Sequence, residues 1–302
     1  MNRKILAQKW FAEGKKNDCL APNSEQAIEA YKESIKQDKN FIDAYVNIGF
    51  IYLAKKNYDK ALKYFQKVTE LEPVNPEAFN NLGYVYEKMA RLGSAKQMYK
   101  KALQLVPENV ESMINIAKIF ELEGNYNGAV EQYKKAIECD PEAIAPHFCL
   151  GVLFDMHDMF DEAIREYEWV LKQNVNHVKA TFNLGNLYAK LGDNELAIYY
   201  LNQALKITPH NFEILNNLSI VYESLSNYVE AAQALKQSIA LNPFQEEAHL
   251  SLIQLQYYQY CLKPDVSKKQ EIIQRIQFVL SLYAKNEKVQ KILEGMELSE
   301  LL

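Results

Sequence analysis

The sequence that decides the fold is residues 76–109, PEAFNNLGYVYEKMARLGSAKQMYKKALQLVPEN. Its apolar residues recur at every third or fourth position in two successive runs, which is the spacing of amphipathic helices. Elsewhere in the chain, pairs such as Lys56-Asn57, Gly124-Asn125 and Gly192-Asp193 separate two runs of the same kind, and Asn and Gly supply the unusual backbone angles of turns. The stretch therefore predicts two antiparallel helices joined by a short turn.

The same pattern returns every 34 residues. Alanine occupies one place in seven successive units, at Ala27, Ala61, Ala95, Ala129, Ala163, Ala197 and Ala231. A bulky apolar column stands four positions later, at Tyr31, Phe65, Tyr99, Tyr133, Tyr167, Leu201 and Leu235. Four of the ten glycines share a place on the first helix, at Gly49, Gly83, Gly151 and Gly185. Because glycine inside a helix costs about 1 kcal/mol relative to alanine, this recurrence predicts a close approach of the second helix.

These residues resemble the tetratricopeptide repeat, whose pattern is an aromatic residue, Leu-Gly and Tyr on the first helix, followed by Ala, Phe or Tyr, Ala and Pro. Residues 76–109 match that pattern nearly throughout, and the resemblance covers residues 8 to about 260. It implies an all-α fold, a right-handed superhelical solenoid of helix-turn-helix repeats with an extended concave surface. The array is similar to that of the O-linked N-acetylglucosamine transferases.

The register of the repeat divides the chain into three parts. We expect residues 1–41 to form a degenerate N-terminal repeat or cap. Residues 42–245 hold six in-register repeats, and residues 246–302 hold a partial eighth repeat and C-terminal capping helices. Together these parts leave no room for a separate catalytic domain.

The two ends depart from the repeat. In the first unit, Trp10 and Gly14 are out of frame with the alanine column, and the connection at 16–23 looks longer than the turns downstream. At the other end we expect two amphipathic helices, at about 267–283 and 287–298. The last of these either caps the array or docks into a groove, its own or a partner's.

Composition excludes several classes of function. The chain carries 34 Lys and Arg against 39 Asp and Glu, a net charge of -5, and has no basic stretch that would neutralise a nucleic-acid backbone. No run approaches the roughly 18 apolar residues of a membrane span, and residues 1–16 contain no signal-peptide core. We therefore expect a cytoplasmic protein that binds neither nucleic acid nor membrane.

The sequence holds no motif of an enzyme, and we predict no catalytic residue, no metal site and no cofactor. Cys139, His147 and Cys149 could be imagined as metal ligands, but His147 occupies an aromatic column of the repeat and the cysteines lie on helices. The charged residues at 155–161 fall in a turn, where side chains are usually solvated.

A column of asparagines is the candidate binding site. It lies two residues before the glycine place and comprises Asn47, Asn81, Asn115, Asn183 and Asn217. The resemblance places this column on the concave face, and side-chain amides can pair with any peptide backbone. One interpretation is therefore a ladder that holds an extended peptide. The other, equally weighted, is that each asparagine bonds a neighbouring helix.

A second column on the same face is mostly acidic, at Asp43, Glu77, Glu111, Glu213 and Glu247. It indicates either an acidic groove suited to basic or neutral segments, or carboxylates that complement the helix dipole. Family members that clamp the C-terminal carboxylate of heat-shock chaperones need lysines here. Lys179 with Asn183 and Asn217 comes nearest, but the next repeat offers Glu247 and Ser251. We predict no such clamp.

The resemblance thus implies a non-enzymatic adaptor or scaffold for protein-protein interaction, which holds an extended peptide or a partner helix in its concave groove. A targeting or accessory subunit of a separately encoded enzyme, such as a glycosyltransferase, is the alternative. A receptor for a small ligand or nucleic acid is a third class. Function rests largely on fold-level analogy at this point.

Overall fold

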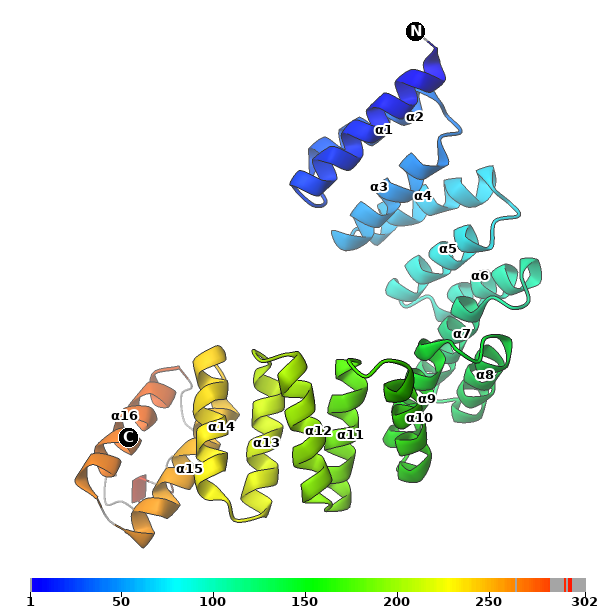
Figure 1. Ribbon diagram of the computed structural model, residues 1–302. Helices are drawn as coiled ribbons and strands as arrows, with labels where there is room; N and C mark the ends of the chain where they lie inside the picture. The colour runs from blue at the N-terminus through cyan, green and yellow to red at the C-terminus, as the bar shows by residue number, and fades with distance from the viewer. Residues whose placement is uncertain (1, 264, 283–290, 292, 295–302) are drawn as a thin grey trace. The chain divides into compact units, whose positions relative to one another are not determined.

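The computed structural model describes residues 2–263, 265–282, 291, 293 and 294. This part of the chain is all-α and contains no strand (Figure 1). Its helices are α1 (Arg3–Leu20), α2 (Glu25–Gln37), α3 (Ile42–Ala54), α4 (Tyr58–Leu71), α5 (Pro76–Lys88), α6 (Leu92–Leu105), α7 (Val110–Leu122), α8 (Tyr126–Cys139), α9 (Ile144–Met156), α10 (Phe160–Gln173), α11 (Val178–Leu191), α12 (Asn194–Ile207), α13 (Phe212–Ser224), α14 (Tyr228–Leu241), α15 (Glu246–Leu262) and α16 (Val266–Leu282). The expected all-α repeat solenoid is confirmed.

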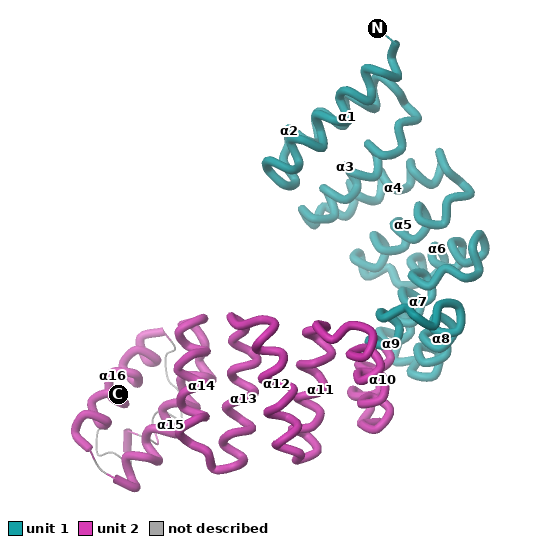
Figure 2. The backbone as a smooth tube through the Cα atoms, viewed as in Figure 1, with its two compact units in different colours: residues 1–149 teal, residues 150–302 magenta. Residues whose placement is uncertain are grey.

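The chain forms two compact units, residues 1–149 and 150–302 (Figure 2). In each unit successive helices pair as predicted, α3 with α4 and α5 with α6 in unit 1, and α11 with α12 and α13 with α14 in unit 2. Within a unit, neighbouring pairs also contact each other, as α4 contacts α5 in unit 1 and α12 contacts α13 in unit 2. The three-part division inferred from the sequence register stays a prediction.

The turn inside each of the seven repeats uses one left-handed residue, at Asn23, Lys56, Ala90, Gly124, Asp158, Gly192 and Ser226. The turn asparagines were expected to supply this backbone angle, and that was wrong for Asn57. Lys56 has φ 56°, whereas Asn57 caps α4 by accepting a hydrogen bond from the Lys60 amide. The left-handed conformation of Lys56 allows the next amide, that of Asn57, to donate a hydrogen bond to the Tyr52 carbonyl at 2.8 Å. This bond closes the end of α3.

The glycines allow the second helix to approach the first. A Cβ on Gly83 would lie 2.6 Å from Cε1 of Tyr99, and one on Gly49 would lie 2.7 Å from the Phe65 ring. Both rings are fully buried. The predicted close approach is confirmed, and it fixes each ring against the backbone of its partner helix.

The first repeat obeys the same rule although its sequence is out of frame. A Cβ on Gly14 would lie 2.5 Å from the Tyr31 ring, so Gly14 is the equivalent of Gly49. The connection does not span 16–23, because α1 continues to Leu20 and α2 begins at Glu25. The connection at 21–24 is one residue longer than the turn at 55–57, which agrees with the longer connection expected there and produces the offset.

At the C-terminal end, the helix expected at about 267–283 is α16, which packs on α15 through a core of Leu250, Ile253, Ile272, Ile276 and Val279. The helix expected at 287–298 lies outside the described residues apart from 291, 293 and 294. Of these, Leu293 is fully buried in the same core.

Replacing Gly83 by alanine is expected to destabilise unit 1 by about 1–3 kcal/mol, because the new methyl group must displace the buried Tyr99 ring. Gly93→Ala is the matched control, since nothing lies within 4 Å of a Cβ at that position of α6. It should be neutral or stabilising by up to about 1 kcal/mol. Urea unfolding followed by circular dichroism measures both. Equal midpoints for the two variants would contradict the close-packing role.

His177 caps α11, and its ring Nδ1 accepts a hydrogen bond from the Ala180 amide at 3.1 Å. Burial lowers the pKa of His177 below its ordinary 6.5, so folding favours the neutral ring that can accept this bond. The stability that the neutral His177 cap adds is complete above pH 6.5, and it is lost as the pH falls through the lowered pKa.

The variant His177→Asn copies the asparagine caps of α5 and α13. We therefore expect acid to lower its free energy of unfolding by roughly 1 kcal/mol less than it lowers that of the native protein. The measurement is the urea midpoint at about pH 7.5 and about pH 5. Burial also lowers the pKa of His249, so part of the acid effect remains in both proteins. An unchanged acid effect in the variant would show that the cap does not titrate.

Candidate peptide-binding groove

The asparagine column lies entirely on the first helices of the repeats. In unit 1, Asn47 is on α3, Asn81 on α5 and Asn115 on α7, and in unit 2, Asn183 is on α11 and Asn217 on α13. Asn115 is buried and the other four are half-buried. The column is therefore divided between the two units, and each part is described within its own unit.

Two of the asparagines bond the hydroxyl of a buried tyrosine sixteen positions earlier. The Asn183 amide donates to the Tyr167 hydroxyl at 3.2 Å, and Asn47 bonds the hydroxyl of Tyr31. The pKa of Tyr31 is raised mainly by burial, and the bond from Asn47 opposes that rise. In these repeats the amide holds the tyrosine that packs on the glycine.

Two more asparagines bond another asparagine on the preceding first helix. The Asn115 amide donates to Asn80 Oδ1 at 3.1 Å, and the Asn217 amide donates to Asn186 Oδ1 at 2.7 Å. Tyr99, which precedes Asn115 by sixteen residues, instead donates its hydroxyl to Glu87 at 3.2 Å. In four of the five places, then, the amide bonds a neighbouring side chain.

Asn81 differs from the rest of the column. The residue sixteen positions before it is Phe65, which has no hydroxyl. Within the described part of the chain, the Asn81 side chain makes no hydrogen bond. The spacing of sixteen gives part of this signal in the sequence, because Asn81 and Asn217 follow Phe65 and Leu201, neither of which has a hydroxyl. Only the structure separates the two, since Asn217 bonds Asn186.

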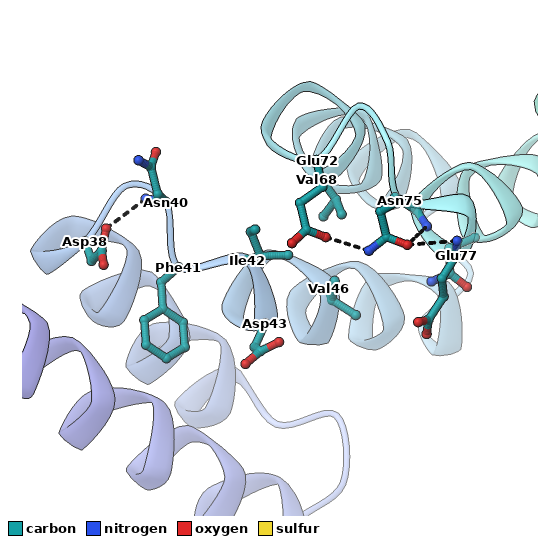
Figure 3. A pocket seen from close by; sticks show the side chains of 12 residues that line it. Asp38, Asn40, Phe41, Ile42, Asp43, Val46, Val68, Glu72, Asn75 and Glu77 are labelled. Carbon is teal, nitrogen blue, oxygen red and sulfur yellow. Dashed lines mark hydrogen bonds between the residues drawn. The ribbon is translucent and has the colours of Figure 1, made fainter. Parts of the chain in front are cut away.

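Asn81 lines a cavity of about 520 Å³ in unit 1, between the beginnings of α3 and α5 and the end of α4 (Figure 3). Apolar side chains of Phe41, Ile42, Val46 and Val68 line part of it. The Asn75 amide donates to Glu72 at 2.6 Å, while Asn75 Oδ1 accepts from the Glu77 amide at 2.9 Å. The wall beside Asn81 is thus held by the cap of α5.

The electrostatic character of this cavity is acidic. The lining includes four carboxylates, from Asp38, Asp43, Glu72 and Glu77, and no basic residue. Figure 3 shows the carboxylates of Asp43 and Glu77, both from the acidic column, pointing to the same side. Two members of the acidic column, Asp43 and Glu77, therefore line the cavity as well as standing in the first turns of their helices.

The other sequence candidates lie apart from this cavity. Cys139 is exposed, Cys149 is half-buried and His147 is buried. No group of three His, Cys, Asp or Glu among the described residues could hold a metal ion. Lys179 is exposed on α11, and the amides of Asn183 and Asn217 are already bonded as above. The absence of a chaperone clamp stays a prediction.

A comparison of two alanine variants isolates the value of the tyrosine bond. Asn81→Ala should be at least as stable as the native protein, because it breaks no hydrogen bond and alanine favours the helix. Asn183→Ala should be less stable than Asn81→Ala by about 1 kcal/mol, since it removes a bond to the buried Tyr167 hydroxyl. Urea unfolding followed by circular dichroism measures both. Equal stabilities would show that the hydrogen bond to Tyr167 makes no net contribution to the free energy of unfolding.

Solved structures share the fold at low sequence identity. A tetratricopeptide repeat protein from Parabacteroides merdae is 16% identical, with a TM-score of 0.57 over 84% of this chain and 97% of that chain. The pilF protein of Pseudomonas aeruginosa is 17% identical, with a TM-score of 0.60 over 73% of this chain and 97% of that chain. A chain of the APC/C hetero-tetramer Cut9-Hcn1 is 16% identical, with a TM-score of 0.57 over 95% of this chain and 54% of that chain. These likenesses show the fold alone.

Family models agree with the repeat read from the sequence, whereas no curated protein matches the chain. Models described as tetratricopeptide repeat match residues 42–75, 64–97, 152–212 and 212–245, and one described as TPR repeat matches residues 23–56 and 117–156. Within the described part of the chain, no helix is long and apolar enough to cross a membrane. With its paired helices and its glycine contacts, the chain belongs to the tetratricopeptide repeat family.

Proposed function

We propose that this chain is a non-enzymatic adaptor that holds an extended peptide at Asn81. Its repeats support a role in protein interaction, and a fold of this kind is typically non-catalytic. The ladder of five equivalent asparagines expected from the sequence is replaced by one available amide. The other four help to hold the repeats together and contribute less to a ligand.

The observation that carries the proposal is the unbonded amide of Asn81 beside an open cavity. A primary amide offers two donor hydrogens and an acceptor oxygen. An extended peptide has backbone N–H and C=O groups that also need partners. Asn81 can therefore bond one peptide unit in both directions without breaking a bond inside the protein, whereas Asn183 must first release Tyr167.

The lining of the cavity adds a preference of charge. Asp43 and Glu77 would repel an acidic peptide, because like charges across an interface cost several kcal/mol when water is excluded. A neutral or basic segment avoids this cost. Apolar lining residues such as Phe41 and Val46 favour a peptide with an apolar side chain next to its polar backbone.

The test is selection from a library of random linear peptides displayed on phage, with the native protein immobilised. Native protein should enrich peptides of neutral or positive charge, and Asn81→Ala should bind the enriched peptides at least about tenfold more weakly, the value of one buried hydrogen bond with a peptide group. Asn183→Ala is the matched control and should bind within about twofold of the native protein.

Two outcomes contradict the proposal. If Asn81→Ala and Asn183→Ala bind the enriched peptides equally well, Asn81 does not hold the peptide. If the enriched peptides are acidic, the cavity of unit 1 is not their site. The targeting-subunit alternative and the cytoplasmic location remain predictions, and the first would be tested by co-purification of an enzyme.

A further inference from the structure

A second groove lies in unit 2, between α10 and α12, which are second helices of consecutive repeats. We call it the tyrosine groove. Its cavity measures about 670 Å³ and is lined by residues of α10 and α12 and by the loop after α10. It is separate from the asparagine column, which lies on first helices, and so it is independent of the proposed function above.

Two adjacent tyrosines form one wall of the tyrosine groove. The Tyr199 and Tyr200 rings meet edge to face, with centroids 5.1 Å apart and an interplanar angle of 81°. Behind them Tyr188 stacks on Tyr200 at 5.5 Å and 6°, which fixes the Tyr200 ring. Tyr199 is 54% exposed. The wall therefore presents aromatic faces that are held in place before any ligand binds.

Nearly all the polar side chains that line the tyrosine groove can donate hydrogen bonds, and its two lysines can only donate. Tyr199 and Tyr200 contribute hydroxyl groups, Gln203 an amide, and Lys172 and Lys206 ammonium groups, whereas Glu168 is the one carboxylate in the lining. Burial, with Tyr188 and Glu168 nearby, raises the pKa of Tyr200, so its phenol is protonated and able to donate. These donors favour a ligand that is rich in hydrogen-bond acceptors.

The two lysines give the tyrosine groove a positive charge, although the chain as a whole has a net charge of -5. Lys172 and Lys206 occupy the same place in consecutive repeats, and both line the groove. Neither makes an ion pair with a described residue. Charge complementarity therefore favours a ligand that brings carboxylates.

These features select one kind of occupant. A polyproline II segment has no internal hydrogen bonds, so all its carbonyl groups are free to accept, and its prolines carry no N–H that would need an acceptor. Its pyrrolidine rings pack on aromatic faces, which is how proline-rich segments are recognised in general. A partner helix could offer only its side chains to the donors of the groove, because its own carbonyls are already bonded. We propose that the tyrosine groove binds an extended, proline-rich segment that carries acidic residues.

The test uses fluorescence anisotropy with a labelled peptide of repeated Pro-Pro-Glu triplets and the full chain. We expect saturable binding that weakens at least about tenfold in Tyr199→Ala and in the double variant Lys172→Glu, Lys206→Glu. Lys134→Glu, a charge reversal at an exposed position of α8 in unit 1, is the matched control and should bind as the native protein does. Circular dichroism establishes whether each variant is folded. If Tyr199→Ala does not fold, the double lysine variant alone tests the proposal.

Two comparison peptides separate the contribution of charge from the contribution of the proline rings. A Pro-Pro-Lys peptide should bind at least about tenfold more weakly, because it meets the two lysines with like charge. A Gly-Ser-Glu peptide keeps the charge but lacks the proline rings, and it should also bind at least about tenfold more weakly. Equal binding of the Gly-Ser-Glu peptide, no binding of the Pro-Pro-Glu peptide, or equal binding by the lysine variant would each overturn the proposal. Since Asn81→Ala should bind the Pro-Pro-Glu peptide normally, its loss there would also count against the tyrosine groove as the site.

Discussion

The contact between a small residue on the first helix and a bulky side chain on the second is the constraint on which the repeats depend, and in five of them the small residue is glycine. Gly49 meets Phe65, Gly83 meets Tyr99 and Gly185 meets Leu201, with no room for a Cβ. Burying such a side chain contributes roughly 1.5–3 kcal/mol, which more than offsets the cost of a helical glycine. The same contact sets how close the two helices lie and which residues remain on the surface.

The identity of that bulky side chain also decides what its neighbours can do. A tyrosine ends in a hydroxyl that cannot be buried without a partner, so the next repeat supplies an amide, as Asn183 does for Tyr167. A phenylalanine makes no such demand, and Asn81 is left available. Between Asn183 and Asn81, one oxygen atom in the core therefore decides whether the amide bonds inside the protein, whereas Asn115 and Asn217 bond asparagines of the preceding first helix.

The two candidate surfaces are chemically different. The cavity at Asn81 in unit 1 is lined by carboxylates and apolar side chains, whereas the tyrosine groove in unit 2 carries aromatic rings and unpaired lysines. Repeats of one geometry can thus present unlike surfaces, because the positions that hold the repeat together are restricted while those between them are free to vary. An adaptor that must join different partners requires this arrangement.

The sequence by itself determined the all-α class, the helix pairs and the close approach at glycine, because these depend on spacings within one repeat, such as that from Gly83 to Tyr99. It also identified the asparagine column, but it could not choose between a peptide ladder and bonds to neighbouring helices. Only the tertiary structure decided that Asn115 bonds Asn80 and that Asn217 bonds Asn186, because these partners come from different repeats. It also showed that Gly14 is in register with Gly49 despite its shifted frame, since helix length and turn length change the count of residues without changing the packing.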